Sequence, residues 1–422
     1  MKTASLSTAQ APPISVPLRF FAIAPLFLLL AAWILAWGDD LSNPHSPALL
    51  AATHCITLGF MALVMLGAVQ QILPVVIGSP MPAQRWVAWF SFLPLIVGTL
   101  SLAGGFLLHE PALLNLACWL LGLAFLTFIA ASLISLSRAT AQNASKNALW
   151  LAISALTLAV TLGSLLAHGY ANGLPLNYPQ LALAHIALAL GGWVTMLIVG
   201  VSFQVVPMFQ LTPNYPKWLS AGLPPALCAA LLLFLCSRLL ESAPLGYLAE
   251  ALFWLLAVSF ATITLKLQSQ RRRRVADATL SFFRLGMISL LLAALFSLLA
   301  PFSPELFKMS AVVTFILGFA LSVIHGMLYK IIPFLIWFHL FRGGIKKGVP
   351  NMKEIIPEAW MWRHLWLHFL TLLAALMTLY WKAAVWLLAT GLALQGILLC
   401  FAIVTAITVY RRTQKRIESV SP

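Results

Sequence analysis

Residues 185–207 read HIALALGGWVTMLIVGVSFQVVP, an apolar stretch that contains Gly192 and Gly200 and then Gln204 and Pro207. The same pattern of two glycines, an amide or amine side chain and a proline occurs twice more, once upstream and once downstream, with identical spacing. The other copies consist of Gly59, Gly67, Gln71 and Pro74, and of Gly318, Gly326, Lys330 and Pro333. Four coincident positions in three copies indicate an internal repeat, and two copies have a histidine near their start, His54 or His185.

The composition predicts an all-α integral membrane protein. Charged residues make up only 8% of the 422 residues and hydrophobic residues 62%, whereas about 25% of a soluble domain is charged. The first apolar run, residues 19–37, is too long for a signal-peptide core and lacks a small-residue cleavage site, so we expect it to be retained. The five cysteines lie in apolar runs without a CxxC motif, which argues against disulfides and covalently attached haem.

Twelve apolar segments are long enough to cross a bilayer, which takes about 20 residues. They lie at residues 19–37, 49–73, 86–106, 112–136, 147–168, 180–209, 217–237, 244–268, 276–300, 308–340, 363–381 and 384–409. The repeated motif falls on the second, sixth and tenth segments. We therefore expect three four-helix repeats in a pseudo-three-fold arrangement, at residues 19–74, 86–207 and 217–333, with 363–409 completing the first arc. Twelve spans also match the two-halved organisation of many transporters.

The net charge of +15 is explained by membrane topology. With both termini in the cytoplasm, 20 of the 25 basic residues fall on the inner side and three in outer loops, as the positive-inside rule requires. The sequence thus predicts a single membrane domain at residues 19–410 in a bacterial-type inner membrane, flanked by cytoplasmic tails at 1–18 and 411–422. The expected partner of the basic residues is the lipid bilayer, and nucleic-acid binding is not expected.

Within each motif copy, the glycines, the polar residue and the proline fall within an arc of about 120° when counted at 100° per residue. Small residues on one face allow neighbouring helices to approach closely, and the proline ends or kinks the helix. Packing therefore explains the glycines and the proline, but it does not explain the histidines.

His54 and His185 lie about five residues into the second and sixth spans, where ionisable side chains are costly and often functional. They stand five and seven residues before the first motif glycine, on helix faces roughly 160° apart. Two histidines at one depth on opposite faces of equivalent helices would meet across a shared space, as the axial ligands of a haem iron do. The alternative is that each imidazole hydrogen-bonds a neighbouring carbonyl or polar side chain.

His325 lies deeper, about 12 residues or 18 Å along its helix from the depth of His54. It therefore cannot ligate the same iron, and it belongs to a second metal site, a proton path or an internal polar cluster. The expected partners at its depth are Gln70, Gln71, Gln204, Tyr329 and Lys330.

The other histidines carry weaker signals. His45, His109 and His168 fall in or beside outer loops, where they would form an outer copper or zinc site, bond cofactor propionates or simply be solvated. His364 and His368 have the i, i+4 spacing of a metal-binding pair, but beside Arg363 the pair equally suits anchoring at the membrane interface. His339 ends the tenth span.

Residues 54–78, HCITLGFMALVMLGAVQQILPVVIG, and residues 185–207 resemble haem-bearing helices of subunit I of the haem–copper oxidases. In that family a histidine similarly precedes a G-x-x-x-polar-x-x-P ending; here His54 precedes Pro74, and His185 precedes Pro207, by nearly equal intervals. The seventh span lacks the histidine pair of the family's copper site, and the cross-linked tyrosine and proton channels have no match. The chain therefore resembles a divergent, NnrS-like member without the full copper site.

This resemblance implies haem b, with copper as a further cofactor, and a role in electron transfer or in NO or O2 chemistry without full oxygen reduction. A respiratory electron donor or another membrane subunit would be its partner. The alternative function is a permease for a metal ion or small solute, with Gln71, Gln204 and Lys330 along its path. A third reading is an accessory subunit with structural histidines. The sequence has no phosphate-binding loop or convincing catalytic triad.

Overall fold

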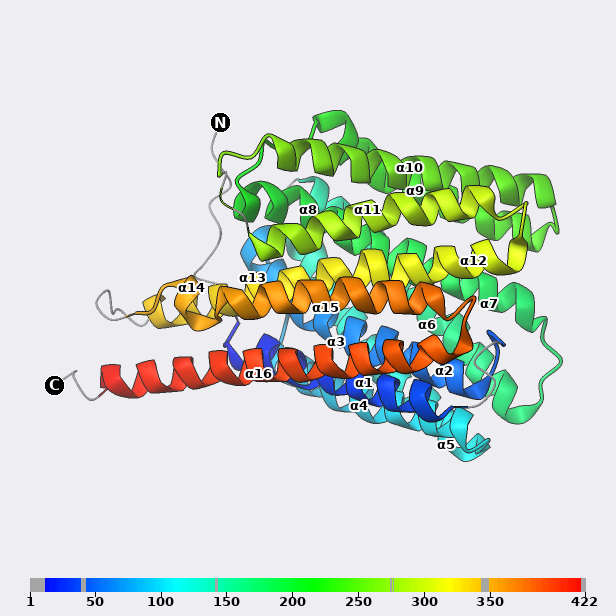
Figure 1. Ribbon diagram of the computed structural model, residues 1–422, viewed down its shortest axis with the longest axis horizontal. Coiled ribbons are helices and arrows are strands. Elements are labelled where there is room, and N and C mark those ends of the chain that lie inside the picture. The colour runs from blue at the N-terminus through cyan, green and yellow to red at the C-terminus, as the bar shows by residue number, and fades with distance from the viewer. Residues whose placement is uncertain are drawn as a thin grey trace. The chain divides into compact units, whose positions relative to one another are not determined.

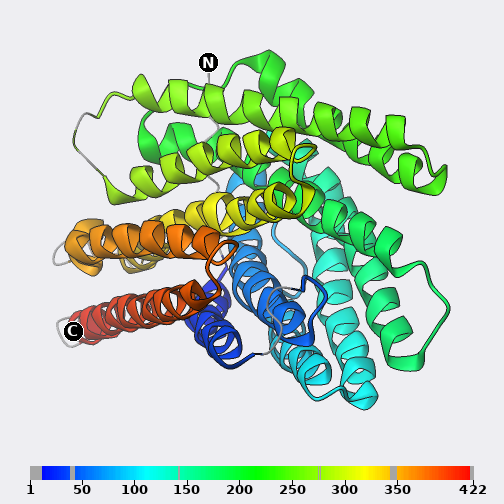
Figure 2. The same cartoon turned by 45° about the vertical axis from the view of Figure 1, so that its right-hand side comes forward.

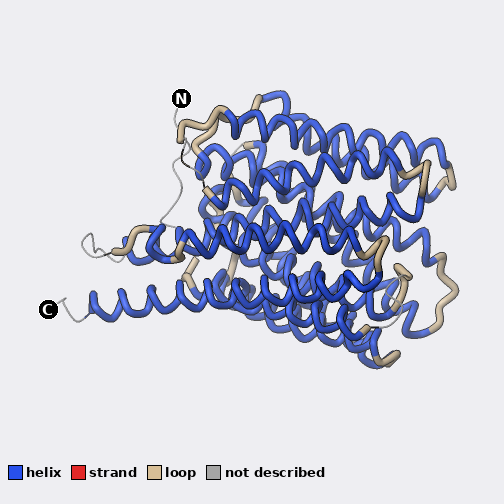
Figure 3. The backbone as a smooth tube through the Cα atoms, in the orientation of Figure 1, coloured by secondary structure: helices blue, strands red, loops and turns tan. Residues whose placement is uncertain are grey.

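A computed structural model describes residues 12–38, 43–140, 143–273, 275, 277–342 and 349–418, and every regular element among them is a helix (Figure 3). Residues 1–11 of the predicted N-terminal tail and 419–422 of the predicted C-terminal tail lie outside this description. Residues 411–418 continue the last helix, α16 (Val385–Glu418).

Eleven helices among the described residues are long and apolar enough to cross a membrane. The predicted class, an all-α membrane protein, is therefore confirmed. They span Ser15–Trp37, Pro47–Ile77, Gln84–Leu107, Pro111–Arg138, Ala144–Asn172, Tyr178–Gln210, Lys217–Leu239, Ala243–Ser269, Ala278–Leu299, Pro304–Phe341 and Lys382–Arg416. The predicted span at 363–381 is the helix α15 (Glu358–Met377). Arg363, His364 and His368 interrupt its apolar sequence, so α15 is not apolar enough to count among the eleven membrane-spanning helices. The count of twelve spans therefore stays a prediction.

The chain divides into two compact units. Unit 1 contains Met1–Pro12, Val69–Val275 and Met287–Ala320, and unit 2 contains Pro13–Ala68, Ala276–Gly286 and Leu321–Pro422. Three of the five boundaries fall inside α3 (Leu63–Ile72), inside α11 (Ala278–Leu299) and at the end of η5 (Thr314–Leu321), so at these points the chain passes between the units within continuous helices.

Unit 1 is built from helices that pack mostly against their neighbours in sequence, α4 on α5, α5 on α6 and α9 on α10 (Figure 1). Its elements are η3 (Leu73–Ile77), α4 (Gln84–Leu107), α5 (Pro111–Arg138), α6 (Ala144–Asn172), α7 (Tyr178–Ile186), η4 (Ala187–Val194), α8 (Thr195–Gln210), α9 (Lys217–Leu239), α10 (Ala243–Ser269) and α12 (Pro304–Val313).

In unit 2 the first helix of the chain packs against the last one. Its elements are α1 (Ser15–Trp37), α2 (Pro47–His54), η2 (Cys55–Ala62), α13 (Ser322–Arg342), α14 (Met352–Ile355), α15, η6 (Lys382–Ala384) and α16. The helix α16 packs against both α1 and α15, and Figures 1 and 2 both show α15 and α16 running side by side (orange and red). α16 also contacts α13, so the last two helices cover a helix that precedes them in the chain.

Polar caps fix where several helices begin. The Ser46 hydroxyl accepts a hydrogen bond from the Leu49 N–H at 3.2 Å at the start of α2. The Asn143 side chain accepts one from the Lys146 N–H at 2.8 Å at the start of α6. Such caps satisfy main-chain donors that have no partner within the helix.

The three helices that carry the repeated motif each contain an eight-residue π-helical segment. The first motif glycine of each copy, Gly59, Gly192 or Gly318, lies inside its segment, η2, η4 or η5. Segments with i→i+5 hydrogen bonds are rare and frequently mark functional sites. The repeat is thus matched by a repeated local backbone conformation.

The π segments change the predicted angular positions of His54 and His185 around their helix axes. η2 begins directly after His54, and η4 begins two residues after His185. A π turn advances by about 80° per residue instead of 100°, so their angles to the motif glycines differ from those predicted. The angle between the two histidine faces is nearly unchanged, because their offsets differ by only two residues.

The motif glycines lie where each motif helix packs against the helix before it. A Cβ on Gly192 would lie 2.6 Å from the Cβ of Ala155, and a Cβ on Gly200 would lie 2.5 Å from the Cβ of Ala148, both in α6. In unit 2, a Cβ on Gly326 would lie 2.8 Å from the Cβ of Phe282 in α11. These contacts confirm the prediction that the glycines serve close helix packing.

We predict that Gly200→Ala lowers the melting temperature of the detergent-solubilised protein, because Ala148 offers a rigid methyl group that cannot turn away. Overpacking of this kind costs about 1–3 kcal/mol, which exceeds the helix-propensity gain of about 1 kcal/mol. Gly122→Ala in α5 is the control, since a Cβ there meets none of the described atoms within 4 Å. A thermal shift assay in which Gly200→Ala melts no lower than Gly122→Ala would contradict the close approach.

Candidate functional site

Three imidazoles meet inside unit 2 and form what we call the histidine cluster: His325 of α13 and His364 and His368 of α15. Their exposed fractions are 0%, 0% and 1%. The ring centroid of His325 lies 4.5 Å from that of His364 and 4.9 Å from that of His368, and the latter two lie 6.5 Å apart. Complete burial favours an internal role for the His364–His368 pair over anchoring at the membrane interface.

Helical spacing brings these side chains together. His364 and His368 are four residues apart and therefore share a face of α15 with Thr371, which is also buried. Ser322, His325 and Tyr329 follow at steps of three and four residues and share a face of α13. The third contributor is Gln395 of α16, with an exposed fraction of 0%.

The orientation of the Gln395 amide follows from Thr371. The Thr371 hydroxyl donates to the Leu367 carbonyl at 2.7 Å, so its oxygen can only accept a bond from Gln395, at 2.8 Å. The amide nitrogen therefore faces Thr371, and the amide oxygen Oε1 faces the imidazoles.

Because Oε1 only accepts, both α15 imidazoles donate to it. The distances are 2.8 Å from His368 Nδ1 and 3.3 Å from His364 Nε2. In each neutral ring the other nitrogen then carries the lone pair. The Ser322 hydroxyl donates to His368 Nε2 at 2.8 Å, and the Tyr329 hydroxyl donates to His364 Nδ1 at 2.9 Å. Both lone pairs are thus turned towards residues of α13 that flank His325.

His325 is the exception in this network. Both of its ring nitrogens are buried without a hydrogen-bond partner among the described residues. Besides the two imidazoles, its ring contacts Phe60 of η2 at a centroid distance of 5.3 Å and Phe282 of α11 at 6.0 Å. A buried polar group without a partner costs about 1–3 kcal/mol, so this residue lowers the stability of the protein as it stands.

We predict that His325→Leu raises the melting temperature of protein purified in the presence of a chelator, because it replaces two unpaired polar atoms by an apolar side chain of similar size. Gln395→Leu should lower the melting temperature, and the free energy of unfolding by about 2–4 kcal/mol, since two buried imidazole donors lose their acceptor. Each variant serves as the control for the other, because both place a leucine in the same cluster and only the lost hydrogen bonds differ. A His325→Leu protein that melts lower than the wild type would show that the imidazole has a stabilising partner.

The sequence predicted Gln70, Gln71, Gln204, Tyr329 and Lys330 as partners of His325, and none of them bonds its ring nitrogens among the described residues. Tyr329 belongs to the cluster through His364. Gln70, Gln71 and Gln204 belong to unit 1, where Gln71 is buried in α3 and Gln204 is half-buried in α8. Ser322, Thr371 and Gln395 were missed. The available signal was Gln395 itself, an amide in the middle of the last apolar span, where such a group requires a polar partner.

His54 and His185 are described within their own units, unit 2 and unit 1. The Nδ1 of His54 is bonded to the Leu50 carbonyl of its own helix at 2.8 Å. The Nδ1 of His185 is bonded to the Ala159 carbonyl of α6 at 2.9 Å, and Gly163 of the same helix makes room for its ring. Both rings are half-buried.

The three histidines predicted in or beside outer loops are exposed, and of these His168 lies within α6. His168 shares hydrogen bonds with Asn115 and Asn172, His109 has a left-handed backbone with φ 52°, and His45 bonds Asn43 through its main chain. Across the described ranges, no three His, Cys, Asp or Glu side chains are arranged to hold a metal ion as they stand. The predicted outer metal site at His45, His109 and His168 therefore gains no support from the geometry.

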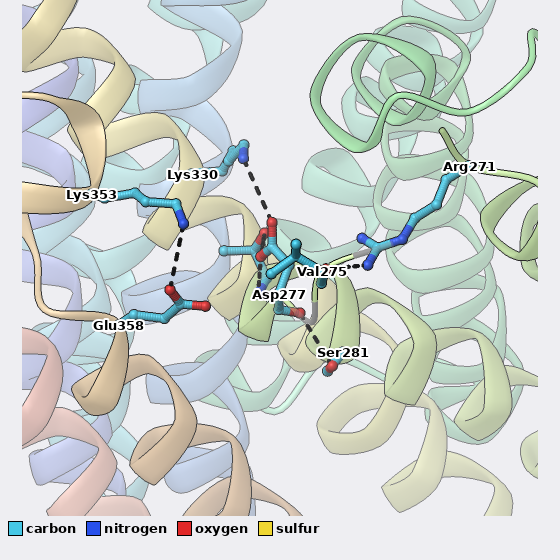
Figure 4. A network of polar contacts seen from close by, with 8 residues as sticks. Arg271, Val275, Asp277, Ser281, Lys330, Lys353 and Glu358 are labelled. Carbon is cyan, nitrogen blue, oxygen red and sulfur yellow. Dashed lines mark hydrogen bonds and ion pairs between the residues drawn. The ribbon is translucent and has the colours of Figure 1, made fainter. Parts of the chain in front are cut away.

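Lys330 is paired with an acid. Its ammonium lies 4.0 Å from the Asp277 carboxylate, with exposed fractions of 21% and 19% for the two side chains (Figure 4). Asp277 also caps α11, because its carboxylate accepts bonds from the Thr279 N–H at 2.9 Å and hydroxyl at 2.7 Å. Burial alone would raise the pKa of the Asp277 carboxyl, but the hydrogen bonds from Thr279 and Leu280 and the Lys330 charge together bring it below the ordinary value of 3.8.

We predict that Asp277→Asn lowers the melting temperature by the equivalent of about 1 kcal/mol at pH 7, because Asn keeps the cap but loses the ion pair. A lowered folded-state pKa gives stability that is present above the unfolded-state pKa and is lost as pH falls through the folded-state value. The difference between the two proteins should therefore be full above pH 4 and shrink below pH 3.8.

The control is Glu358→Gln, which removes the Lys353–Glu358 pair in the same unit (Figure 4). Its atoms lie 3.9 Å apart, but the side chains are 58% and 43% exposed, so the change should be within about 0.5 kcal/mol. Equal effects of the two substitutions would mean that burial does not strengthen the Asp277 pair.

Eleven apolar helices among the described residues define the class of the protein, a multi-pass membrane protein. No protein-family model matches the chain, and comparison with curated proteins finds none that is similar to it.

Proposed function

We propose that this chain is a haem-binding membrane protein of the haem–copper oxidase-like superfamily, with His54 and His185 as the axial ligands of one b-type haem. Its role would be electron transfer or NO- or O2-related chemistry without full oxygen reduction. The pairing of the two histidines rests on their matched depth in the sequence. The observation that carries the proposal is the protonation state that each imidazole must have.

A main-chain carbonyl only accepts hydrogen bonds, so the Nδ1 of His54 beside Leu50 and that of His185 beside Ala159 must carry the proton. In each neutral ring the lone pair is then on Nε2. A metal-bound histidine almost always donates its other N–H to a carbonyl or carboxylate, which fixes the ring and raises the basicity of the ligand.

The local backbone supports the same assignment. Each of the two histidines is followed within two residues by a π segment, and the third π segment, η5, occupies the corresponding place in the third motif copy. Such segments are frequent at functional sites because they disturb the regular hydrogen-bond ladder. On this basis we further propose twelve spans in three repeats of four, with α15 as the eleventh.

We predict a Soret band and about one haem b per chain in protein purified from haem-sufficient cells, as measured by the pyridine haemochrome method. His54→Ala and His185→Ala should each abolish or shift the band, because a haem with two axial histidines loses its low-spin spectrum when one is removed. A reduced-minus-oxidised spectrum gives the same test in membranes.

The matched control is His339→Ala. The Nδ1 of His339 is also bonded to a carbonyl one turn earlier, that of Leu335 at 2.9 Å, but the residue lies outside the motif. Gel filtration should show that all three variants remain folded. Protein without a Soret band, or a band unchanged by both motif substitutions, would rule out the haem. A loss of solute uptake in cells lacking the gene would then favour the permease.

A further inference from the structure

We infer that Gly163 of α6 is a positioning residue for His185, and that it tunes the midpoint potential of the proposed haem. This role rests on the proposed function, because it requires His185 to be a haem ligand. Two features of unit 1 point to it: the space that Gly163 leaves beside the imidazole, and the hydrogen bond that is made through that space.

Gly163 lies on the side of α6 that packs against the motif helix of α7, η4 and α8. At Gly192 and Gly200 the motif helix supplies the small residue, and α6 meets it with alanine. At the level of His185 the motif helix presents an imidazole, and here α6 has the glycine. The small residue therefore changes from one helix to the other where the histidine lies.

Alanine at position 163 would not leave room for the ring. A Cβ on Gly163 would lie 2.8 Å from Cε1 of His185 and 3.2 Å from its Nδ1, whereas carbon atoms in contact are normally about 3.5–4.0 Å apart. The imidazole would have to retreat by roughly half an ångström or more to restore this distance. Glycine is also less favourable than alanine in the interior of a helix, so ordinary packing does not call for it at this position.

The missing side chain also uncovers the acceptor of the imidazole. In an α-helix each side chain leans back over the turn before it, towards the carbonyl four residues earlier. For Gly163 this is the Ala159 carbonyl, which stays open from the side. A carbonyl oxygen has two lone pairs, so it can accept the bond of the helix and a second one from the His185 Nδ1–H, at 2.9 Å. Gly163 thus provides both the space for the ring and the access to its acceptor.

This bond bears on the redox potential of an iron held by the other ring nitrogen. An N–H donated to a carbonyl raises the basicity of a histidine ligand, which favours ferric over ferrous iron, and such outer hydrogen bonds are among the features that set haem potentials. With alanine at position 163 the ring retreats, and the bond lengthens beyond the usual range of about 2.7–3.2 Å. The ferric state then loses more stabilisation than the ferrous state, so the midpoint potential rises.

The test is a redox titration of the haem spectrum of the full-length protein in detergent, which requires no turnover. For Gly163→Ala we expect the preference for ferric iron to weaken by about tenfold, the lower end of what the loss of an outer partner causes. A tenfold change in a one-electron couple raises the midpoint potential by about 59 mV. Loss of the haem from a folded Gly163→Ala protein would support the same role.

Gly169→Ala is the matched control in the same helix. Its Cβ would lie 2.5 Å from Cδ1 of Leu176, so it is equally crowded but touches no histidine. It should melt lower than the wild type and keep the wild-type potential. An unchanged potential in Gly163→Ala, or equal shifts in both variants, would overturn the role of Gly163 and leave the haem proposal standing. Wild-type protein without a Soret band would instead overturn the haem proposal itself.

A second pair of variants covers the case in which Gly163→Ala does not fold, because it removes the ring with which the new methyl group collides. In His185→Gly, added imidazole should occupy the space beside Gly163 and restore the low-spin spectrum. In His185→Gly combined with Gly163→Ala, the imidazole affinity measured by spectral titration should be about tenfold weaker. Equal affinities would contradict the positioning role.

Discussion

A hydrogen-bond donor that is buried among apolar helices must find its acceptor within the protein, because a bilayer offers none. In unit 2 this requirement is met by one oxygen atom. Gln395 Oε1 accepts from both α15 imidazoles, and the Thr371 hydroxyl decides which end of the amide they meet. A helix as polar as α15 can pack against α13 and α16 only because these bonds are made. His325, which takes no part in them, is therefore the residue whose presence packing does not explain.

The repeated motif combines packing with a local change of backbone. Its glycines let α6 approach the motif helix at Gly192 and Gly200, and α11 approach at Gly326. Its first glycine also lies in a π segment in each copy. The two features belong together, because a glycine lacks the side chain that would crowd a widened turn against a neighbouring helix. A histidine next to such a segment is held by main-chain geometry as well as by its own contacts.

Much of the fold was predictable from the sequence, and much of the site was not. Long apolar runs and the motif glycines predict helices and their close approaches, because both depend on local composition. From the sequence, His364 and His368 suited a metal-binding pair or an interfacial anchor beside Arg363, and nothing local shows that α13 and α16 cover that face. The sequence placed Lys330 on a predicted polar path, and it could not show that Asp277, at the start of a different helix, pairs with it. Partners that come from distant helices leave no pattern in the sequence.

The direction of the bonds around Gln395 has one more consequence. Tyr329 and Ser322 donate to the imidazoles, the imidazoles donate to Oε1, the amide donates to Thr371, and Thr371 donates to the Leu367 carbonyl. Each of these hydrogens therefore has a defined donor, in a series that runs from α13 through α15 to Gln395 of α16 and returns to α15. Reversal of the Gln395 amide would set its nitrogen against two imidazole donors, so the amide is held in one orientation. Gln395 is thus the one amide in a row of imidazoles and hydroxyls, and its orientation fixes the tautomers of both α15 imidazoles.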